Sequence, residues 1–456
     1  MIVQKFGGTS VEDAAALRRL SQIVGASHAR GEKPIVVVSA MGRTTDRLVE
    51  ALARAAAGDE HAAKKILMDH VTRPTLAVSR DIFGAGGQEV DAGFAPYFTT
   101  LDRMAGAVAV LRSVPPEARD QFLAQGELIS SLLVSRVLSF RGLPAVWVDA
   151  RRALSTDAHF GRAQPDFAAT RTSAGKELGE PSGRGEIPVV GGFVGAAPDG
   201  RTTVLGRGGS DYSAAIFGAC LDAALVEIWT DVDGMMTADP RIVPEARVLE
   251  RISAEEASEL AYFGARVLHP STLAPAVEKG IPVRVRNARK PDAAGTEILA
   301  GASAATENVR SIACKRGIAT VDISTSRMLL AAGFLRTIFD VFARHETAVD
   351  MVSTSEVSVS VTVDDLDRLS EIRAELEALA DVEVAGGRAI VCLVGENLKF
   401  TPGIAARIFR AVEDVNVLMI SQGASRRNVS FVVAEEDVDR TVCLLHREFF
   451  GGGGAA

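Results

Sequence analysis

The sequence predicts an α/β fold with a mostly parallel sheet between layers of helices, followed by two small ferredoxin-like modules. Over the first two-thirds of the 456 residues, short β-branched runs alternate with amphipathic stretches, which is typical of sheets covered by helices on both faces. Beyond residue 310 one pattern of strands and helices occurs twice, which indicates two similar small domains. We therefore expect one large domain and two smaller ones.

The large domain is defined by its predicted strands and one long helix. The helix is predicted from Glu117 to Phe140, after two prolines at 115–116. Gly126 lies within this stretch, so two consecutive helices are an alternative. Six apolar runs predict buried strands: Ile2–Lys5, Ile35–Ser39, Ala145–Val148, Ile187–Val194, Leu225–Thr230 and Ile281–Arg286.

The repeat is visible residue by residue in the last third of the chain. Gly333, Ile338-Phe339 and Met351 recur as Gly403, Ile408-Phe409 and Met419. Each copy predicts the order βαββαβ, which suits a ferredoxin-like module. A stretch of small residues before the first copy predicts a linker. The expected divisions are a catalytic domain at 1–298, a linker at 299–310 and modules at 311–388 and 389–450.

Composition and charge exclude several classes of function. Hydrophobic residues make up 47% and charged residues 24%, the balance of a soluble globular protein. The net charge of −8 offers no basic surface for nucleic acid. The apolar runs are too short to span a membrane, so we expect a cytoplasmic protein with small-molecule partners. The four cysteines lie far apart, which favours reduced thiols over disulfides or a tightly bound metal.

Two glycine turns could hold anions. The first, at Lys5–Ser10, precedes a helix, so its backbone amides could cradle a phosphate. It has neither P-loop nor GxGxxG spacing, and a tight turn with a surface lysine is the alternative. In the second turn, Gly206–Asp211, Arg207 could clamp a carboxylate. Asp211 could also act as a helix cap.

Three further positions could touch a ligand. Thr230-Asp231 end a predicted strand, where ligands of open α/β sheets gather, although ordinary turn chemistry also explains the segment. The loop Ser39–Asp46 likewise follows a strand, and its hydroxyl groups could bind substrate or cap the next helix. Glu127 is a carboxylate among apolar residues and could receive an ammonium group; a solvated helix charge is the alternative.

Together the motifs resemble the aspartate kinases (aspartokinases) of the amino-acid kinase family, in particular the monofunctional lysine-sensitive type with two C-terminal ACT domains. The resemblance covers the chain almost end to end and implies a carbamate kinase-like three-layer sandwich. The segments that carry it are KFGGTSV at 5–11, VVVSAMG at 36–42, GE at 126–127, LGRGGSDYSA at 205–214, WTDVDG at 229–234, TADPR at 237–241, FGARVLHP at 263–270 and GFLRTIFDVFARHETAVDMVSTSEVSVSV at 333–361.

The resemblance implies roles at the matching positions. Lys5 and Asp211 would be catalytic. Substrate would be bound by Ser39, Thr45, Glu127, Arg207, Gly208, Gly209 and Ser210. ATP would be bound by Lys5, Gly7, Gly8, Thr9, Ser10, Thr230, Asp231, Met236, Arg241, Arg266 and Val267. The amino-acid effector would be bound by Met328, Phe334, Leu335, Asp350, Ser355 and Glu356.

The implied reaction is phosphorylation of the side-chain carboxylate of L-aspartate by ATP with Mg²⁺. This reaction opens lysine, threonine and methionine biosynthesis, and lysine is the expected feedback effector. Pairing of ACT domains implies a homodimer or homotetramer. Met236 and Arg266 depart from the tyrosine and lysine usual in the family. Two alternatives are another enzyme of the same fold, such as a glutamate, acetylglutamate or nucleoside monophosphate kinase, and an amino-acid sensor without turnover.

Overall fold

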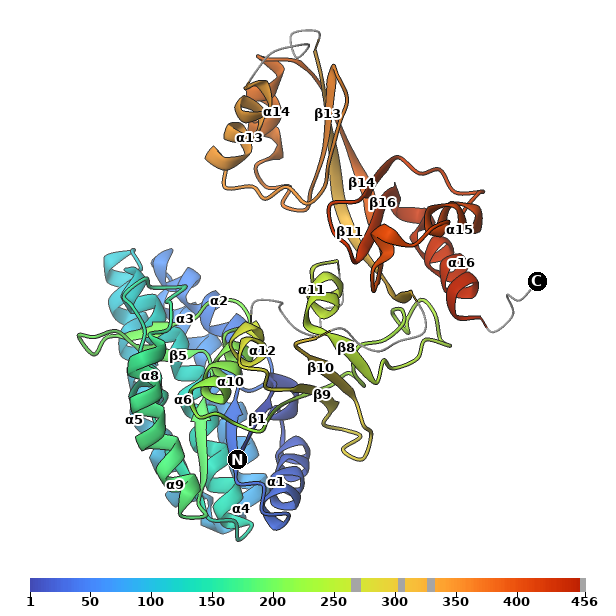
Figure 1. The fold of residues 1–456 in the computed structure, drawn as a ribbon. Helices are drawn as coiled ribbons and strands as arrows, with labels where there is room; N and C mark the ends of the chain where they lie inside the picture. Colours follow the sequence, from blue (N-terminus) through green and yellow to red (C-terminus); the bar gives the residue numbers. More distant parts are fainter. Residues whose placement is uncertain (264–271, 302–307, 326–332, 452–456) are drawn as a thin grey trace. The chain divides into compact units, whose positions relative to one another are not determined.

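The chain forms two compact units, each of which is described by itself. The computed structural model describes residues 1–263, 272–301, 308–325 and 333–451. The first unit comprises residues 1–235, 250–254 and 267–301, and the second comprises 236–249, 255–266 and 302–456 (Figure 1). No helix in the described ranges combines the length and the apolar character needed to cross a bilayer.

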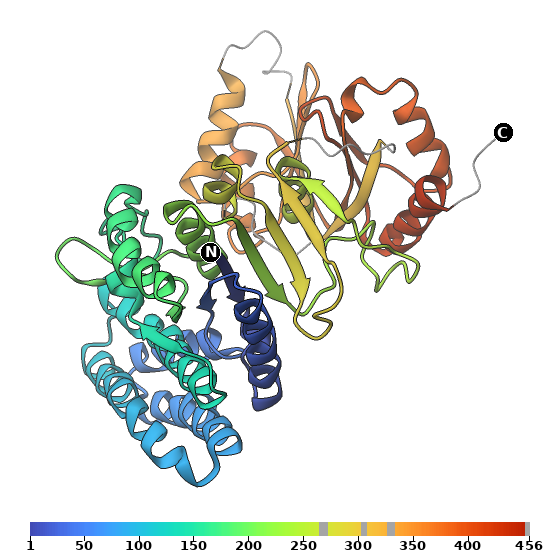
Figure 2. The ribbon, with the colours of Figure 1, turned by 60° about the horizontal axis from the view of Figure 1, so that its bottom comes forward.

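The first unit is built on an eight-stranded sheet with the order β3-β4-β2-β1-β7-β9-β10-β8. Every pairing is parallel except that of β9 with β10, which confirms the predicted mostly parallel sheet. Figure 2 shows β7, β9 and β10 side by side. The strands are β1 (Ile2–Phe6), β2 (Pro34–Val38), β3 (Ala145–Val148), β4 (Ile187–Gly191), β7 (Leu225–Thr230), β8 (Arg251–Ser253), β9 (Val283–Asn287) and β10 (Thr296–Leu299).

Helices cover both faces of this sheet, as alternating strands and amphipathic stretches require. Helices α1 (Ala14–Ala29) and α6 (Pro116–Phe140) pack on one face, and α10 (Gly209–Cys220) packs on the other. A hairpin of β5 (Val194–Ala196) and β6 (Thr202–Val204) adjoins α6. The remaining helices are η1 (Gly8–Ser10), α2 (Thr44–Ala56), α3 (Glu60–Leu67), η2 (Met68–Thr72), α4 (Arg73–Phe83), η3 (Gly84–Gly86), α5 (Gly87–Leu111), α7 (Ala150–Ala153), α8 (Phe167–Ala174), η4 (Gly175–Gly179), α9 (Glu180–Gly183) and α12 (Ala274–Glu278).

Helix α6 runs unbroken through Gly126, so the alternative of two helices is wrong. A Cβ atom at Gly126 would lie 3.0 Å from the Cβ atom of Ala40. Glycine is needed here for close approach of the helix to the loop after β2, and not to break the helix. The predicted strand Ile187–Val194 divides into β4 and the start of β5, because the chain turns at Gly192-Phe193.

The second unit contains one six-stranded sheet with the order β12-β13-β11-β14-β16-β15. The long strands β11 (Val309–Ser324) and β14 (Asp381–Gly395) run antiparallel through its centre. The other elements are α11 (Ala254–Tyr262), α13 (Phe334–Arg344), β12 (Val352–Thr354), β13 (Ser358–Val363), α14 (Leu369–Glu377), η7 (Leu398–Phe400), α15 (Ile404–Ala411), β15 (Met419–Gln422), β16 (Asn428–Ala434), η8 (Glu435–Asp437) and α16 (Val438–Phe450).

The two sequence repeats fold as predicted but share the central strands. Residues 318–324 of β11 pair with 381–388 of β14, whereas 309–315 pair with 390–395. The last strand of the second copy is therefore supplied by residues 309–315, which precede the first copy in sequence. With this strand the second copy has the order βαββαβ. The expected linker, 299–310, reaches into β11, and its residues 302–307 lie outside the described ranges. The boundaries drawn from the sequence stay a prediction.

Candidate active site

A buried ion pair marks the centre of the candidate site. Lys5 lies near the end of β1, between β2 and β7, and its Nζ is 2.6 Å from Oδ1 of Asp211. The two side chains are only 10% and 14% exposed. Asp211 lies in the first turn of α10. Because parallel strands end at one edge of the sheet, Lys5 lies where ligands of α/β proteins bind.

The first glycine turn is fixed against the end of β7. Gly7 donates its N–H to the Trp229 carbonyl over 3.0 Å, and Ser10 donates its N–H to the Gly7 carbonyl over 2.9 Å. Trp229 in turn stacks on Phe6, with ring planes 7° apart. Two of the four turn amides are therefore engaged within the fold. The backbone amides of Gly8 and Thr9 are therefore the two that could form the predicted anion cradle.

The second glycine turn has the backbone conformation that its sequence requires. Gly206 and Gly208 have φ angles of 82° and 71°, which side chains with a Cβ atom rarely adopt. The turn presents exposed Arg207 between them and starts α10 at Gly209. The cap position of α10 is Gly208, so Asp211 is not the helix cap, and its carboxylate pairs with Lys5.

Glu127 is a buried carboxylate that lacks a full set of partners. The residue is 3% exposed. Its Oε1 accepts the Ala40 N–H over 3.3 Å, and its Oε2 has no hydrogen-bond partner among the described residues. Burial raises the pKa of Glu127 to about 8. The solvated helix charge that the sequence allowed is therefore wrong, and the geometry suits a ligand that brings positive charge.

One cavity of about 490 Å³ brings the candidate residues together. It is lined by Lys5 and Asp211, by Gly8 of the first turn, and by every residue predicted to bind substrate. Those predicted substrate residues are Ser39, Thr45, Glu127, Arg207, Gly208, Gly209 and Ser210. Gly7, Thr9 and Ser10 lie in the same turn without lining the cavity. The roles of all these residues stay predictions.

The cavity also contains residues that the sequence did not single out. Phe193 lines it with a φ angle of 67°, and Arg119, Leu123, Gly161 and Val204 complete the α6 side. A phenylalanine after two glycines at the end of a predicted strand was the available signal for Phe193, because bulky residues seldom have positive φ. Nothing local distinguished the other four.

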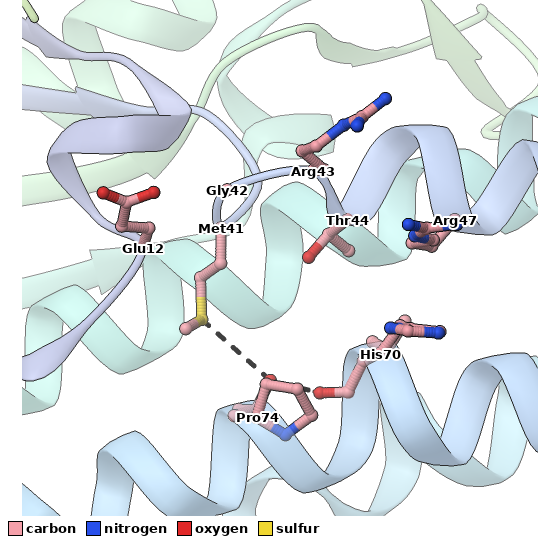
Figure 3. Close-up of a pocket in the computed structure, with 10 residues that line it drawn as sticks. Glu12, Met41, Gly42, Arg43, Thr44, Arg47, His70 and Pro74 are labelled. Carbon is pink, nitrogen blue, oxygen red and sulfur yellow. Dashed lines mark hydrogen bonds between the residues drawn. The ribbon is translucent and has the colours of Figure 1, made fainter.

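A smaller cavity of about 260 Å³ also has Gly42 in its lining (Figure 3). Arg47 of α2 and His70 of η2 line it, together with Met41, whose sulfur lies 4.0 Å from the Thr75 hydroxyl. The cationic side chains near its mouth are already paired, Arg43 with Asp46 and Arg47 with Glu50. We assign this cavity no ligand.

The predicted nucleotide residues divide between the two units. Thr230 is the last residue of β7 in the first unit, and Asp231 follows it. Met236 and Arg241 belong to the second unit, where Arg241 pairs with Asp239. In that unit Ile312 donates its N–H to the Thr237 carbonyl over 2.8 Å. Arg266 and Val267 lie outside the described residues.

The predicted effector residues lie in the first repeat, except that Met328 falls outside the described ranges. Phe334 and Leu335 begin α13, and Ser355 and Glu356 lie exposed between β12 and β13. The Asp350 side chain is 2% exposed and 2.8 Å from Nζ of Lys315, and it also accepts the Tyr262 hydroxyl over 2.6 Å. Its carboxylate is therefore already bound within the unit.

The fold and site define an amino-acid kinase: a mostly parallel sheet ending at a cavity with a lysine, two glycine turns and a buried carboxylate. The amino acid kinase family model matches residues 1–287, and an ACT domain model matches residues 391–449. Lysine-sensitive aspartokinase 3 of Escherichia coli is 37% identical over 463 residues, covering 99% of both chains. The chain belongs to the aspartokinases.

Other relatives and solved structures agree with this family. Aspartokinase 1 of Arabidopsis thaliana, a chloroplastic enzyme, is 34% identical and covers 99% of this chain and 80% of its own. The structure of E. coli aspartokinase III with lysine and aspartate, in the T state, matches with a TM-score of 0.85 at 36% identity over 99% of both chains. The R-state structure of that protein with aspartate and ADP matches with a TM-score of 0.84 at 35% identity, covering 99% of this chain and all of the other.

Proposed function

We propose that this protein transfers the γ-phosphoryl group of ATP to the side-chain carboxylate of L-aspartate, giving 4-phospho-L-aspartate. The observation that carries the proposal is the buried, incompletely paired Glu127 in one cavity with Arg207 and the Lys5–Asp211 pair. An α-amino acid needs one anionic and one cationic partner, and Glu127 and Arg207 supply them. The aspartate-bound E. coli relatives support the choice of amino acid.

The chemistry needs alignment more than proton transfer. The attacking β-carboxylate is ionised near neutral pH, so no general base has to activate it. Glu127 holds the ammonium group, Arg207 the α-carboxylate, and Ser39, Thr45 and Ser210 orient the substrate from the cavity wall. Lys5 neutralises charge on the phosphoryl oxygens, and Asp211 holds the Lys5 ammonium in place. Amides of Gly8 and Thr9 complete the cradle.

The site fits a Mg²⁺ ion that arrives with the nucleotide. No group of three or more acidic, histidine or cysteine side chains arranged for a metal occurs in the part of the chain that the structure describes. Mg²⁺ commonly binds through substrate phosphates and one or two carboxylates, and Asp211 is a cavity carboxylate that could serve. When bound, the ion supplies further neutralisation of phosphate charge.

We further propose that L-lysine inhibits the enzyme through the ACT modules, with Phe334, Leu335, Ser355 and Glu356 as contacts. Lysine sensitivity of the E. coli relative supports this. Because Lys315 already occupies the Asp350 carboxylate, an effector ammonium would have to displace or share that contact. We also propose a homodimer or homotetramer formed through these modules, and a cytoplasmic location, as expected for the pathway.

The proposal is tested by incubating the full chain with L-aspartate and Mg-ATP and trapping the acyl phosphate with hydroxylamine. Aspartyl hydroxamate must form, with less formed when lysine is added. Turnover on glutamate or a nucleoside monophosphate, but not on aspartate, would support another kinase of this fold. Tight aspartate binding without hydroxamate would support a sensor instead.

A further inference from the structure

Asp120 is a second buried carboxylate on the helix that carries Glu127. It is 0% exposed and lies seven residues before Glu127 in α6, which corresponds to about two turns, or about 10 Å. Its Oδ2 accepts two backbone N–H groups, from Gly161 over 2.9 Å and from Val204 over 3.0 Å. No basic side chain forms an ion pair with it among the described residues.

The two amides bound by Asp120 belong to segments that build the cavity wall. Gly161 and Val204 both line the cavity, and Val204 also accepts the Ala163 N–H over 2.9 Å. A Cβ atom at Gly206 would lie 3.1 Å from the Gly161 carbonyl oxygen, so the two segments are in direct contact. Arg207 follows Val204 by three residues. Asp120 therefore joins the Gly161 segment to the strand that ends three residues before Arg207.

We propose that Asp120 is a positioning residue for substrate: it fixes the Arg207 clamp at a set distance from Glu127. The inference depends on the proposed function, in which Glu127 binds the ammonium group of aspartate and Arg207 binds its α-carboxylate. Because Asp120 and Glu127 lie on one continuous helix, their separation is set by helix geometry and not by loops. The helix thereby sets the spacing of the two sites that recognise an α-amino acid.

A purely structural role explains the observations less well. A buried carboxylate without a cationic partner is a poor source of stability, and burial raises the pKa of Asp120 while the two amide bonds oppose that rise. Its Oδ1 has no partner among the described residues. The carboxylate instead connects a loop at Gly161 with the end of strand β6 at Val204, which lie 41 and 84 residues away in sequence.

The test measures steady-state constants for aspartate and ATP in three single variants of the full-length enzyme. Asp120→Ala removes both anchors, so the KM for aspartate should rise about tenfold or more, because small misplacements of binding groups are costly. The KM for ATP should stay within about twofold. Asp120→Asn should restore the wild-type KM for aspartate, since its amide oxygen can accept both N–H groups. Leu133→Ala, at another fully buried position of α6, is the matched control for destabilisation and should leave both KM values unchanged.

A double-mutant cycle with Arg207→Ala separates positioning from a general effect. If Asp120 acts through Arg207, Asp120→Ala should add less than about twofold to the KM for aspartate in the Arg207→Ala background. Should Asp120→Ala not fold, Asp120→Glu provides the same test. This variant keeps a carboxylate that accepts the two N–H groups, but its side chain is one methylene longer and shifts the segments that it binds. Equal KM values in wild type and Asp120→Glu, or full multiplicative effects in the cycle, would overturn the inference. Absence of aspartate turnover in the wild-type enzyme would instead overturn the proposed function.

Discussion

The pH dependence of aspartate binding follows from the burial of Glu127. Burial raises the pKa of this carboxyl group from 4.5 to about 8. At about 1.4 kcal/mol per pKa unit, the cavity destabilises the ionised form by about 5 kcal/mol relative to water. An ammonium group needs the ionised form, so substrate binding must release a proton below about pH 8. Affinity for aspartate should therefore fall as the pH falls.

The size of this effect can be worked out directly. With a pKa of about 8, the ionised fraction of Glu127 is about three in four at about pH 8.5 and about one in thirty at about pH 6.5. The dissociation constant for aspartate should therefore rise about 25-fold over this range. Isothermal titration calorimetry in buffers of different ionisation enthalpy should show release of about 0.9 proton per aspartate at about pH 7.

The variant Glu127→Gln provides the control, because its side chain keeps the size and loses the titration. It should bind aspartate weakly at every pH and release no proton. The same pKa predicts a stability effect: the folded state holds this proton more tightly than the unfolded state, so stability is lost as the pH rises from about 4.5 towards about 8. Glu127→Gln should remove that loss in thermal unfolding. Wild-type affinity that is flat between about pH 6.5 and about pH 8.5 would refute the reasoning.

Three further predictions concern charges of the two units. Lys5→Ala should lower kcat by about 10²-fold or more with a smaller change in the KM for aspartate, since Lys5 acts on developing charge; an unchanged kcat in the hydroxamate assay removes it from the mechanism. Arg207→Ala should raise the KM for aspartate by roughly 10-fold to 100-fold through loss of charged hydrogen bonds, and wild-type affinity in direct titration contradicts the clamp. Lys315→Met frees the Asp350 carboxylate, so the concentration of lysine needed for half-inhibition should change, with uninhibited kcat as the control; identical inhibition curves exclude competition at Asp350.

Local sequence was sufficient for the large features of this protein. Alternation of strands and amphipathic stretches predicted the sheet, and the glycine turns at 5–10 and 206–211 marked Lys5, Arg207 and Asp211 as candidates for ligand binding. Each of these inferences rests on residues close together in the chain. The resemblance to aspartokinases added roles that spacing alone left open, such as Glu127 for the ammonium group.

What the sequence did not predict depends on contacts between distant segments. Gly126 allows helix α6 to pack closely against Ala40. The local sequence shows the glycine but not the distant residue that it contacts. Residues 309–315 complete the sheet of the second repeat by pairing with 390–395, across about a sixth of the chain. Asp120 carried no local signal, because the two amides that it binds are far away in sequence.

Helix α6 has two carboxylates buried in positions where apolar side chains would make a more stable core. Within the described part of the chain, Glu127 has one oxygen without a hydrogen-bond partner and Asp120 has another, and burial raises the pKa of both groups. Stability alone selects against such residues. Their presence is explained if the partner of Glu127 is a substrate ammonium group and the task of Asp120 is to hold the loops around it. Under the proposed function, the helix combines recognition and positioning, and the aspartate ammonium group supplies the partner that the buried Glu127 carboxylate needs.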